Sequence, residues 1–234
     1  MKSRNSKIIV LLLLIGLFLT GCGKKEESDT KKPSNDNQNQ TDVKNLKIVD
    51  ANSKSRPYAV MINNISVARP LQSGLQDAYL MYEIIVEGGI TRYMALFMDQ
   101  NTTRIGSIRS ARHYFLDYAL ENDAIYVHYG QAIYATELLE SGKVEDLNGL
   151  EGAIDSATFY RDKSRKAPHN AFVSTDGLDA GIELKGYDTE LPSDYEGHYQ
   201  FNEDDEKEIE LTDGADAAVV QPGYYINNPW FVYN

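Results

Sequence analysis

The sequence predicts an α+β fold, with a mixed sheet and flanking helices in a main domain and a second, smaller β-rich domain after it. Short apolar runs bounded by Gly, Pro or Asn predict strands at residues 58–62, 80–86 and 90–98. Apolar residues at helical spacing predict helices between later strands. From about residue 187 short aromatic segments follow. Because the chain stops at Asn234 inside a strand-like segment, the second domain is expected to be incomplete.

Residues 1–22 predict a lipoprotein signal peptide. Three basic residues precede an apolar run at residues 8–19, which is shorter than the ~20 residues that a membrane-spanning helix needs. The sequence LTGC at residues 19–22 looks like a bacterial lipobox, in which the cysteine receives the lipid. The alternative is an ordinary secretory signal with a chance cysteine. We expect acyl chains on Cys22 to anchor the mature protein at the extracytoplasmic face of the cell membrane.

Composition limits the remaining possibilities. Residues 23–45 are almost entirely polar, which predicts a disordered tether between the anchor and the folded region. The net charge of −12 argues against general nucleic-acid binding, because such binding needs a basic surface. Cys22 is the single cysteine, so no intrachain disulfide can form, and no cofactor or metal is predicted.

The main domain is predicted to cover residues 46–190, and it begins with a buried strand at residues 58–62. One helical turn is expected at residues 74–79. The strands at 80–86 and 90–98 form a hairpin, because the paired glycines between them supply the positive φ of a tight turn. Glu83 and Glu87 are expected on a solvated face, with Arg92 as a pairing partner across the turn.

A helix is predicted to begin at Ser107 or Ser110, either of which can cap it. Arg109, His113 and Asp117 would then lie together beside its buried stripe.

Further elements follow from the same patterns. A helix at residues 131–140 is expected to turn Ile133, Leu138 and Leu139 inward. The segment 141–156 is predicted to be looser. Strands are expected at residues 124–128, 158–160 and 171–173, a capped helix at 175–184, and strands of the second domain (191–234) at 195–202, 217–220, 224–225 and 230–233.

Three motifs now stand in order: VEGGITR at residues 86–92, GSIRSAR at 106–112 and APHN at 167–170. With them the chain resembles the YerB-like lipoproteins, a domain-of-unknown-function family of Gram-positive bacteria, from about Arg56 to its end. The usual chain of that family is longer. The resemblance implies two α+β domains on a lipid anchor, and it brings no established reaction or catalytic residues.

The same segments predict an anion site. Arg109 and Arg112 lie near a predicted helix start, where free N–H groups favour an anion, and the guanidinium fork binds phosphate or carboxylate at two points. His128 ends a strand, where α/β sheets place ligands, and the basic run at residues 161–166 could close over the same point. The predicted ligand-binding residues are Arg92, Arg109, Arg112, His128, His169 and Asn170.

A structural role is the alternative for each of these residues. The two arginines could pair with carboxylates and fasten the helix to the sheet. His113 could pair with Asp117, and His169 could serve as a turn residue. The carboxylates available to the arginines are Asp99, Asp117, Glu83 and Glu87.

The sequence therefore predicts a lipid-anchored ligand-binding or accessory protein of the Gram-positive cell envelope. Its expected partners are the membrane, through the lipid on Cys22, and an anionic envelope ligand (a teichoic-acid phosphate or a peptidoglycan carboxylate) or the acidic face of a protein. No Gly-x-Ser-x-Gly, His-Glu-x-x-His or P-loop motif is present, which disfavours an enzyme. The alternatives are a scaffold that uses its 16 tyrosines as an interface, and a hydrolase of an envelope polymer. The hydrolase would use a metal or acid–base site drawn from Asp99, His113, Asp117, His128 and His169.

Overall fold

The computed structural model describes residues 49–50, 52–199, 201 and 212–232. The chain divides into two compact units, Met1–Thr41 and Asp42–Asn234, and every described residue belongs to the second. The predicted signal peptide, Cys22 and the tether lie outside the described residues.

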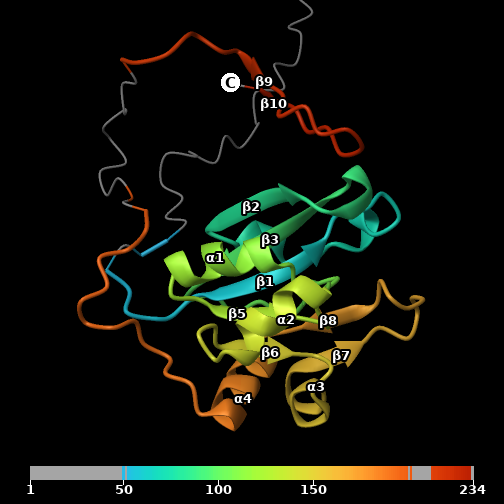
Figure 1. Cartoon of the computed structure of the whole chain (residues 1–234), viewed down its shortest axis with the longest axis vertical. Coiled ribbons are helices and arrows are strands. Elements are labelled where there is room, and N and C mark those ends of the chain that lie inside the picture. The colour runs from blue at the N-terminus through green and yellow to red at the C-terminus, as the bar shows by residue number, and fades with distance from the viewer. Residues whose placement is uncertain (1–48, 51, 200, 202–211, 233–234) are drawn as a thin grey trace, which may run out of the picture. The chain divides into compact units, whose positions relative to one another are not determined.

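A five-stranded mixed sheet in the order β2-β3-β1-β5-β6 forms the centre of the domain (Figure 1). Its strands are β1 (Tyr58–Asn63), β2 (Leu80–Ile85), β3 (Thr91–Phe97), β5 (Ile125–His128) and β6 (Asp146–Asn148). β1 pairs antiparallel with β3 and parallel with β5, so the sheet changes direction at its middle strand. The expected α+β class is thereby confirmed.

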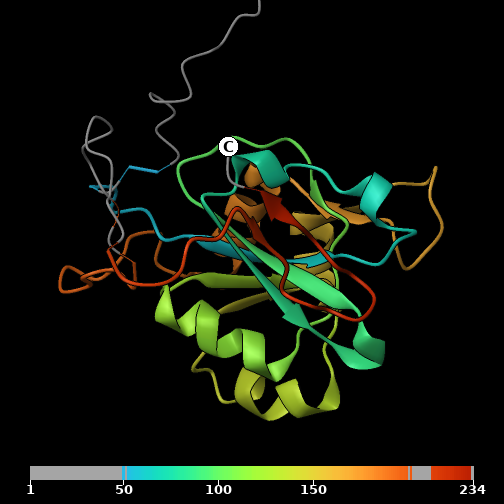
Figure 2. The same ribbon diagram turned by 90° about the horizontal axis from the view of Figure 1, so that it is seen from above.

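Both faces of this sheet are covered, which explains why β1 is apolar at nearly every position. Ala59 and Met61 point into a core shared with α1 (His113–Glu121) and α2 (Ile133–Glu140). Val60 and Ile62 point into a second core on the opposite face. Figure 2 shows α1 and α2 together on one side of the sheet. The elements on the other side are α3 (Gly152–Thr158), α4 (Thr175–Lys185) and a smaller antiparallel sheet of β4 (Ile105–Gly106), β8 (Ala171–Val173) and β7 (Phe159–Arg161).

The segment 107–111 is extended, so the prediction of a helix from Ser107 or Ser110 was wrong. Its backbone is held between neighbours. The Asn63 N–H donates to the Ser107 carbonyl at 2.9 Å, and the Arg109 N–H donates to the Met61 carbonyl at 3.0 Å. The Ala111 N–H donates to the Gly130 carbonyl at 2.8 Å. Tertiary hydrogen bonds therefore override the local helical pattern, and α1 begins only at His113.

Three other differences from the predictions concern α2, the segment 141–156 and the start of α4. Ile133 is exposed, so its predicted inward orientation was wrong, and Ala135 is the buried residue of α2. The "loose" segment contains β6 and α3, whose short lengths gave no periodic signal. Ser174 caps α4 by accepting the Gly177 N–H, so the cap lies one position before residue 175, where the capped helix was predicted to begin.

The C-terminal part contains little regular structure among its described residues. The described residues within 195–202 form no strand, contrary to the prediction, and Tyr224 and Tyr225 are likewise not in a strand. A two-stranded antiparallel ladder joins β9 (Val219–Val220) and β10 (Phe231–Val232). The organisation of residues 191–234 as a separate domain stays a prediction.

One segment of this C-terminal part makes hydrogen bonds to the main sheet. Asn227 is buried and donates to the Asn64 carbonyl at 2.8 Å and to the Thr91 hydroxyl at 2.7 Å. The Tyr224 hydroxyl donates to the Glu83 carbonyl at 2.8 Å. These bonds tie residues 224–227 to the β2–β3 side of the sheet.

Gly181 tests how closely α3 and α4 pack. A Cβ atom at this position would collide with the Thr158 hydroxyl and approach a Leu147 methyl to 3.1 Å. We expect Gly181→Ala to lower the free energy of unfolding by about 1–3 kcal/mol through overpacking. Gly152→Ala is the matched control, because nothing lies within 4 Å of its Cβ position. Urea unfolding that shows equal stability for both variants would contradict this packing.

Candidate functional site

Arg92 lies at the start of β3 and is buried to 5% exposure. Its Nη1 donates to the carbonyl of Ser110. Arg112 donates to the same carbonyl through its own Nη1, at 3.3 Å. The extended segment 107–111 therefore brings the side chains of two predicted site residues to one carbonyl.

Arg112 makes a two-point ion pair with Glu87. Its Nε donates to both carboxylate oxygens at 2.8 and 2.9 Å, and its Nη2 donates to Oε2 at 2.7 Å. The carboxylate pairing expected under the structural alternative is therefore present for Arg112, and it fastens the start of α1 to the turn after β2. Glu83 instead accepts from Asn64 at 3.1 Å and from the Thr91 hydroxyl. The predicted pairing of these glutamates with Arg92 is not what the structure shows.

Arg109 has a different environment. Its backbone is fixed on both sides, because its N–H donates to Met61 and its carbonyl accepts the Tyr129 N–H at 3.1 Å. The guanidinium makes one long hydrogen bond, from Nη1 to the Pro168 carbonyl at 3.4 Å. Its Nε is buried without a hydrogen-bond partner, and no carboxylate among the described residues pairs with it. Arg109 is therefore held in place with most of its donors unused.

The three guanidinium groups lie close enough to affect one another. Burial, and then the charges of Arg112 and Arg109, lower the pKa of Arg92 to about 10. Burial and the Arg112 charge lower the pKa of Arg109. Hydrogen bonds from Arg112 lower the pKa of Glu87, which among the described residues is the one carboxylate whose charge raises the pKa of Arg92. The cluster thus holds three positive charges against one negative charge, an imbalance that an added anion would relieve.

His169 joins this cluster from the loop after β7. The Asn63 Oδ1 accepts the Ile65 N–H at 3.3 Å, which fixes the amide so that Nδ2 faces His169 Nδ1 at 2.8 Å. Nδ1 therefore accepts, and the neutral ring carries its proton on Nε2. Burial and the nearby Arg109 charge lower the pKa of His169. The ring is neutral at neutral pH, with an N–H donor that no other described residue uses.

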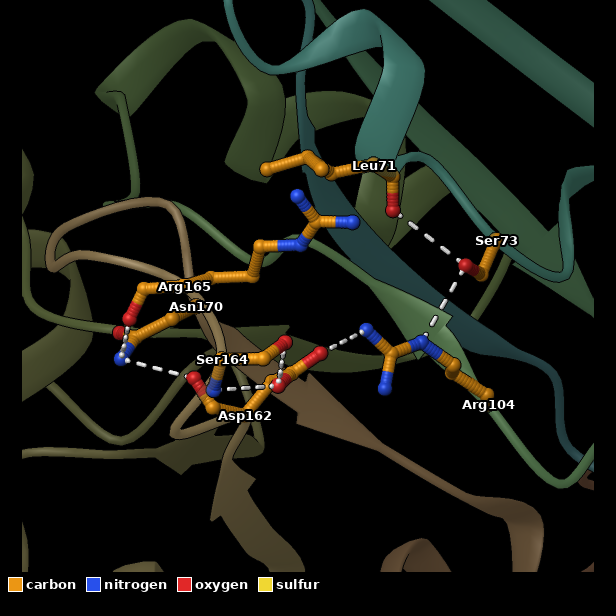
Figure 3. Close-up of polar contacts among 7 residues, drawn as sticks. All are labelled: Leu71, Ser73, Arg104, Asp162, Ser164, Arg165 and Asn170. Carbon is orange, nitrogen blue, oxygen red and sulfur yellow. Dashed lines mark hydrogen bonds and ion pairs between the residues drawn. The ribbon is translucent and has the colours of Figure 1, made fainter.

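The basic loop between β7 and β8 has its own internal framework (Figure 3). Asp162 accepts from the Ser164 N–H and from Arg104, at 2.9 and 2.8 Å. Hydrogen bonds from Ser164 and Arg104 lower the pKa of Asp162 to about 2, so this carboxylate stays ionised. Asn170, a predicted ligand-binding residue, is buried and donates to the Asp162 and Arg165 carbonyls. Its amide therefore holds the loop in shape.

The framework leaves the other cations of the loop exposed. Figure 3 shows the guanidinium of Arg165 without a partner among the residues drawn. Lys163, Arg165 and Lys166 are all exposed and form no ion pair within the described part of the chain.

His128 is held inside the fold by both of its ring nitrogens. It is completely buried, its Nδ1 is 2.8 Å from the Gly130 carbonyl, and its Nε2 is 2.9 Å from Asp146 Oδ2. With both nitrogens occupied, the ring joins β5 to β6 and offers no free donor to a ligand.

The residues of the hydrolase alternative are not brought together. Asp99 accepts from Ser55, His128 meets Asp146, and His169 meets Asn63. His113 packs its ring on Tyr114 and Tyr134. Over the residues that the structure describes, no group of three His, Cys, Asp or Glu side chains has the geometry to hold a metal ion.

Two residues of the cluster escaped sequence reasoning. Asn63 ends β1 and fixes His169, and the buried Tyr126 hydroxyl lies near Arg92 and Arg112. Asn63 carried a signal, since it is the polar residue at the carboxyl end of a buried strand. Tyr126 carried none.

The structure is an α+β domain with a cluster of three arginines, Arg92, Arg109 and Arg112, at the carboxyl end of β1. The family model described as "Protein of unknown function (DUF3048) N-terminal domain" matches residues 45–188, and the chain belongs to this family. It is 36% identical over 180 residues to a Bacillus subtilis (strain 168) protein named "Putative lipoprotein YerB", covering 76% of this chain and 52% of that protein. The resemblance seen in the sequence is confirmed.

A solved structure gives the same relation. The crystal structure of YerB protein from Bacillus subtilis matches with a TM-score of 0.55 at 41% identity, over 58% of this chain and 46% of that chain. The chain spans about half the length of these relatives. Within the described residues, no helix is both long enough and apolar enough to cross a membrane.

The buried His128–Asp146 pair can be tested by its effect on stability. We expect His128→Ala to lower the free energy of unfolding by about 2–4 kcal/mol, because it leaves Asp146 without its partner inside the fold. His113→Ala, at an exposed position with ring contacts alone, should change it by less than about 0.5 kcal/mol. Chemical unfolding of both variants is the measurement, and an unchanged midpoint for His128→Ala would contradict the structural role.

Proposed function

We propose that this protein is an accessory lipoprotein that binds an anionic group of the cell envelope between Arg109, Arg112 and His169. The proposal depends mainly on the unused hydrogen-bond donors of Arg109. Its backbone is fixed, its Nε is buried without a partner, and its guanidinium makes a single long hydrogen bond. A buried donor without an acceptor costs free energy, so its retention is expected where a ligand supplies the acceptor.

The neighbouring groups fit this role. Arg109 presents a planar fork that matches the two oxygens of a phosphate or carboxylate. The imidazole N–H of His169 adds a neutral donor. Arg112 adds positive charge, and Glu87 fixes the position of its guanidinium group. Arg92 stabilises the segment 107–111 by donating to the Ser110 carbonyl. The ligand thus meets positions that are fixed before it binds, which lowers the entropic cost of binding.

The membrane anchor is part of the same proposal. The LTGC sequence at residues 19–22 supports acylation of Cys22, and the name of the Bacillus subtilis relative is that of a lipoprotein. On this proposal, the acyl chains hold the domain at the outer face of the cell membrane. The ligand is then an exposed phosphate or carboxylate of the envelope.

Sulfate provides a direct test of the site. Sulfate at 100 times its dissociation constant should stabilise the unit 42–234 by about 2.7 kcal/mol, which corresponds to about 5–10 °C in Tm. Arg109→Gln should abolish this shift while the domain still unfolds cooperatively, because the side chain contributes one weak bond to the fold. Lys143→Gln, which removes an exposed charge elsewhere, should keep the shift. A shift that survives Arg109→Gln would refute the proposed site.

His169 makes binding depend on pH. Asn63 and Arg109 favour the neutral ring, whereas a bound anion favours the protonated ring, so binding takes up a proton. Affinity therefore rises as the pH falls through the pKa of His169 in the complex. The gain approaches tenfold for each unit by which the anion raises the His169 pKa.

Sulfate is suited to this measurement because its charge does not change between pH 5 and 8. Calorimetric titration should show the rise for the native protein and for His113→Asn, and a flat profile for His169→Asn. An unchanged profile in His169→Asn would show that another group takes up the proton.

A further inference from the structure

Three large apolar side chains of the main domain are strongly exposed in one region. Ile133 is 81% exposed, Tyr134 is 79% exposed and Leu150 is 67% exposed. Ile133 and Tyr134 form the first turn of α2, and Leu150 lies in the turn between β6 and α3. Isolated exposed apolar residues are ordinary, but a cluster of large ones at a surface is typical of a contact site.

Asn148 places Leu150 beside the residues that precede α2. Its Oδ1 accepts the Gly130 N–H at 3.1 Å and the Leu150 N–H at 3.0 Å, and its Nδ2 donates to Gln131 at 3.2 Å. A Cβ at Gly130 would lie 3.2 Å from a Leu150 methyl. Leu150 therefore lies against residues 130–131, directly before the first turn of α2.

The same residues lie beside the arginine cluster. The Ala111 N–H donates to the Gly130 carbonyl at 2.8 Å, and the Ala132 N–H donates to the Ala111 carbonyl at 3.0 Å. Ala111 stands between Arg109 and Arg112 in the chain. The Tyr134 ring also lies 6.1 Å from the ring of His113, which follows Arg112. We call Ile133, Tyr134, Leu150, Arg109 and Arg112 together the apolar–arginine face.

More cations border this face. Arg161 stacks over the Tyr129 ring at 4.2 Å, and the Tyr129 N–H donates to the Arg109 carbonyl. The loop that carries Pro168, the acceptor of the Arg109 hydrogen bond, also carries the unpaired Lys163, Arg165 and Lys166. A protein of net charge −12 thus gathers positive charge next to its exposed apolar side chains.

We propose that the apolar–arginine face docks on the membrane surface and binds the phosphate of an anionic phospholipid. This inference rests on the anion site proposed above and names its ligand class. The phosphate lies against Arg109, while Ile133, Tyr134 and Leu150 enter the region between headgroups and acyl chains. Apolar and aromatic side chains next to arginine and lysine are a composition that binds such an interface. A soluble polyanion would use the cations but leave the three apolar side chains in water.

An anchor on Cys22 makes weak docking sufficient. A tethered domain meets the membrane at a high effective concentration, so a modest intrinsic affinity gives a largely docked population.

The test uses residues 42–234, the compact unit that holds both cores, so that no acyl chain contributes. Its sedimentation with phosphatidylglycerol vesicles is compared with sedimentation with phosphatidylcholine vesicles at 0.1 M salt. We expect binding to phosphatidylglycerol alone. The triple change Ile133→Ser, Tyr134→Ser and Leu150→Ser should weaken it at least about tenfold, because binding scales with the inserted apolar area. The triple variant should keep the sulfate-induced rise in Tm.

Two further variants complete the design. Arg109→Gln should lose both the sulfate response and vesicle binding. Leu120→Ser with Leu184→Ser, which removes exposed apolar side chains from α1 and α4, should change neither.

Each other outcome overturns the inference. A native sulfate response without vesicle binding would leave the anion site intact and refute membrane docking. Absence of both responses would refute the site and the docking together. Vesicle binding that survives the triple change would show attraction by charge alone. Sedimentation-equilibrium evidence of a dimer that the triple change dissociates would instead identify this face as an interface between two copies of the chain.

Discussion

The rest of the site depends on the position of residues 107–111. This segment lies between the carboxyl end of β1 and the segment 129–132. Main-chain hydrogen bonds on both sides hold this segment extended, and Ile108 also donates to Ala171 in the smaller sheet at 2.8 Å. The segment therefore joins the two sheets and both cores. It also spaces Arg109 and Arg112 along an extended chain. Had the predicted helix formed here, both arginines would have lain on a single helix surface beside His113.

The two arginines show how similar residues acquire different roles. Arg112 satisfies its donors within the fold, through Glu87 and two carbonyls, and so stabilises the start of α1. No carboxylate in the described part of the chain pairs with Arg109, which keeps a buried donor unused. Burying Arg92 beside two other guanidinium groups opposes folding. The lowered pKa of Arg92, caused first by burial and then by the charges of Arg112 and Arg109, reflects that cost. The hydrophobic cores on both faces of the sheet offset this cost of the arginine cluster, as is usual where a fold retains a polar site.

The proposed activities share one surface. The anion site, the basic loop and the three exposed apolar side chains all adjoin the segment 107–111 and the residues that pair with it. A lipid on Cys22 would bring this surface to the membrane, and the arginine cluster would select an anionic phosphate there. His169 would make that contact stronger at lower pH. The parts are therefore consistent with a single role at the membrane–wall boundary, and each part can be removed separately by substitution.

The sequence by itself determined the strands β1, β2, β3 and β5, the glycine turn between β2 and β3, and the position of α4, because these depend on local periodicity and turn chemistry. Its motifs also identified the family. Only the tertiary structure gave Arg109 and Arg112 different hydrogen-bond partners and buried His128 against Asp146. It also brought His169 to Asn63, 106 residues away in the chain. The exposed Ile133 was likewise decided by packing, since Ala135 took the inward position. Such outcomes depend on hydrogen bonds and contacts between distant segments, which no local pattern encodes.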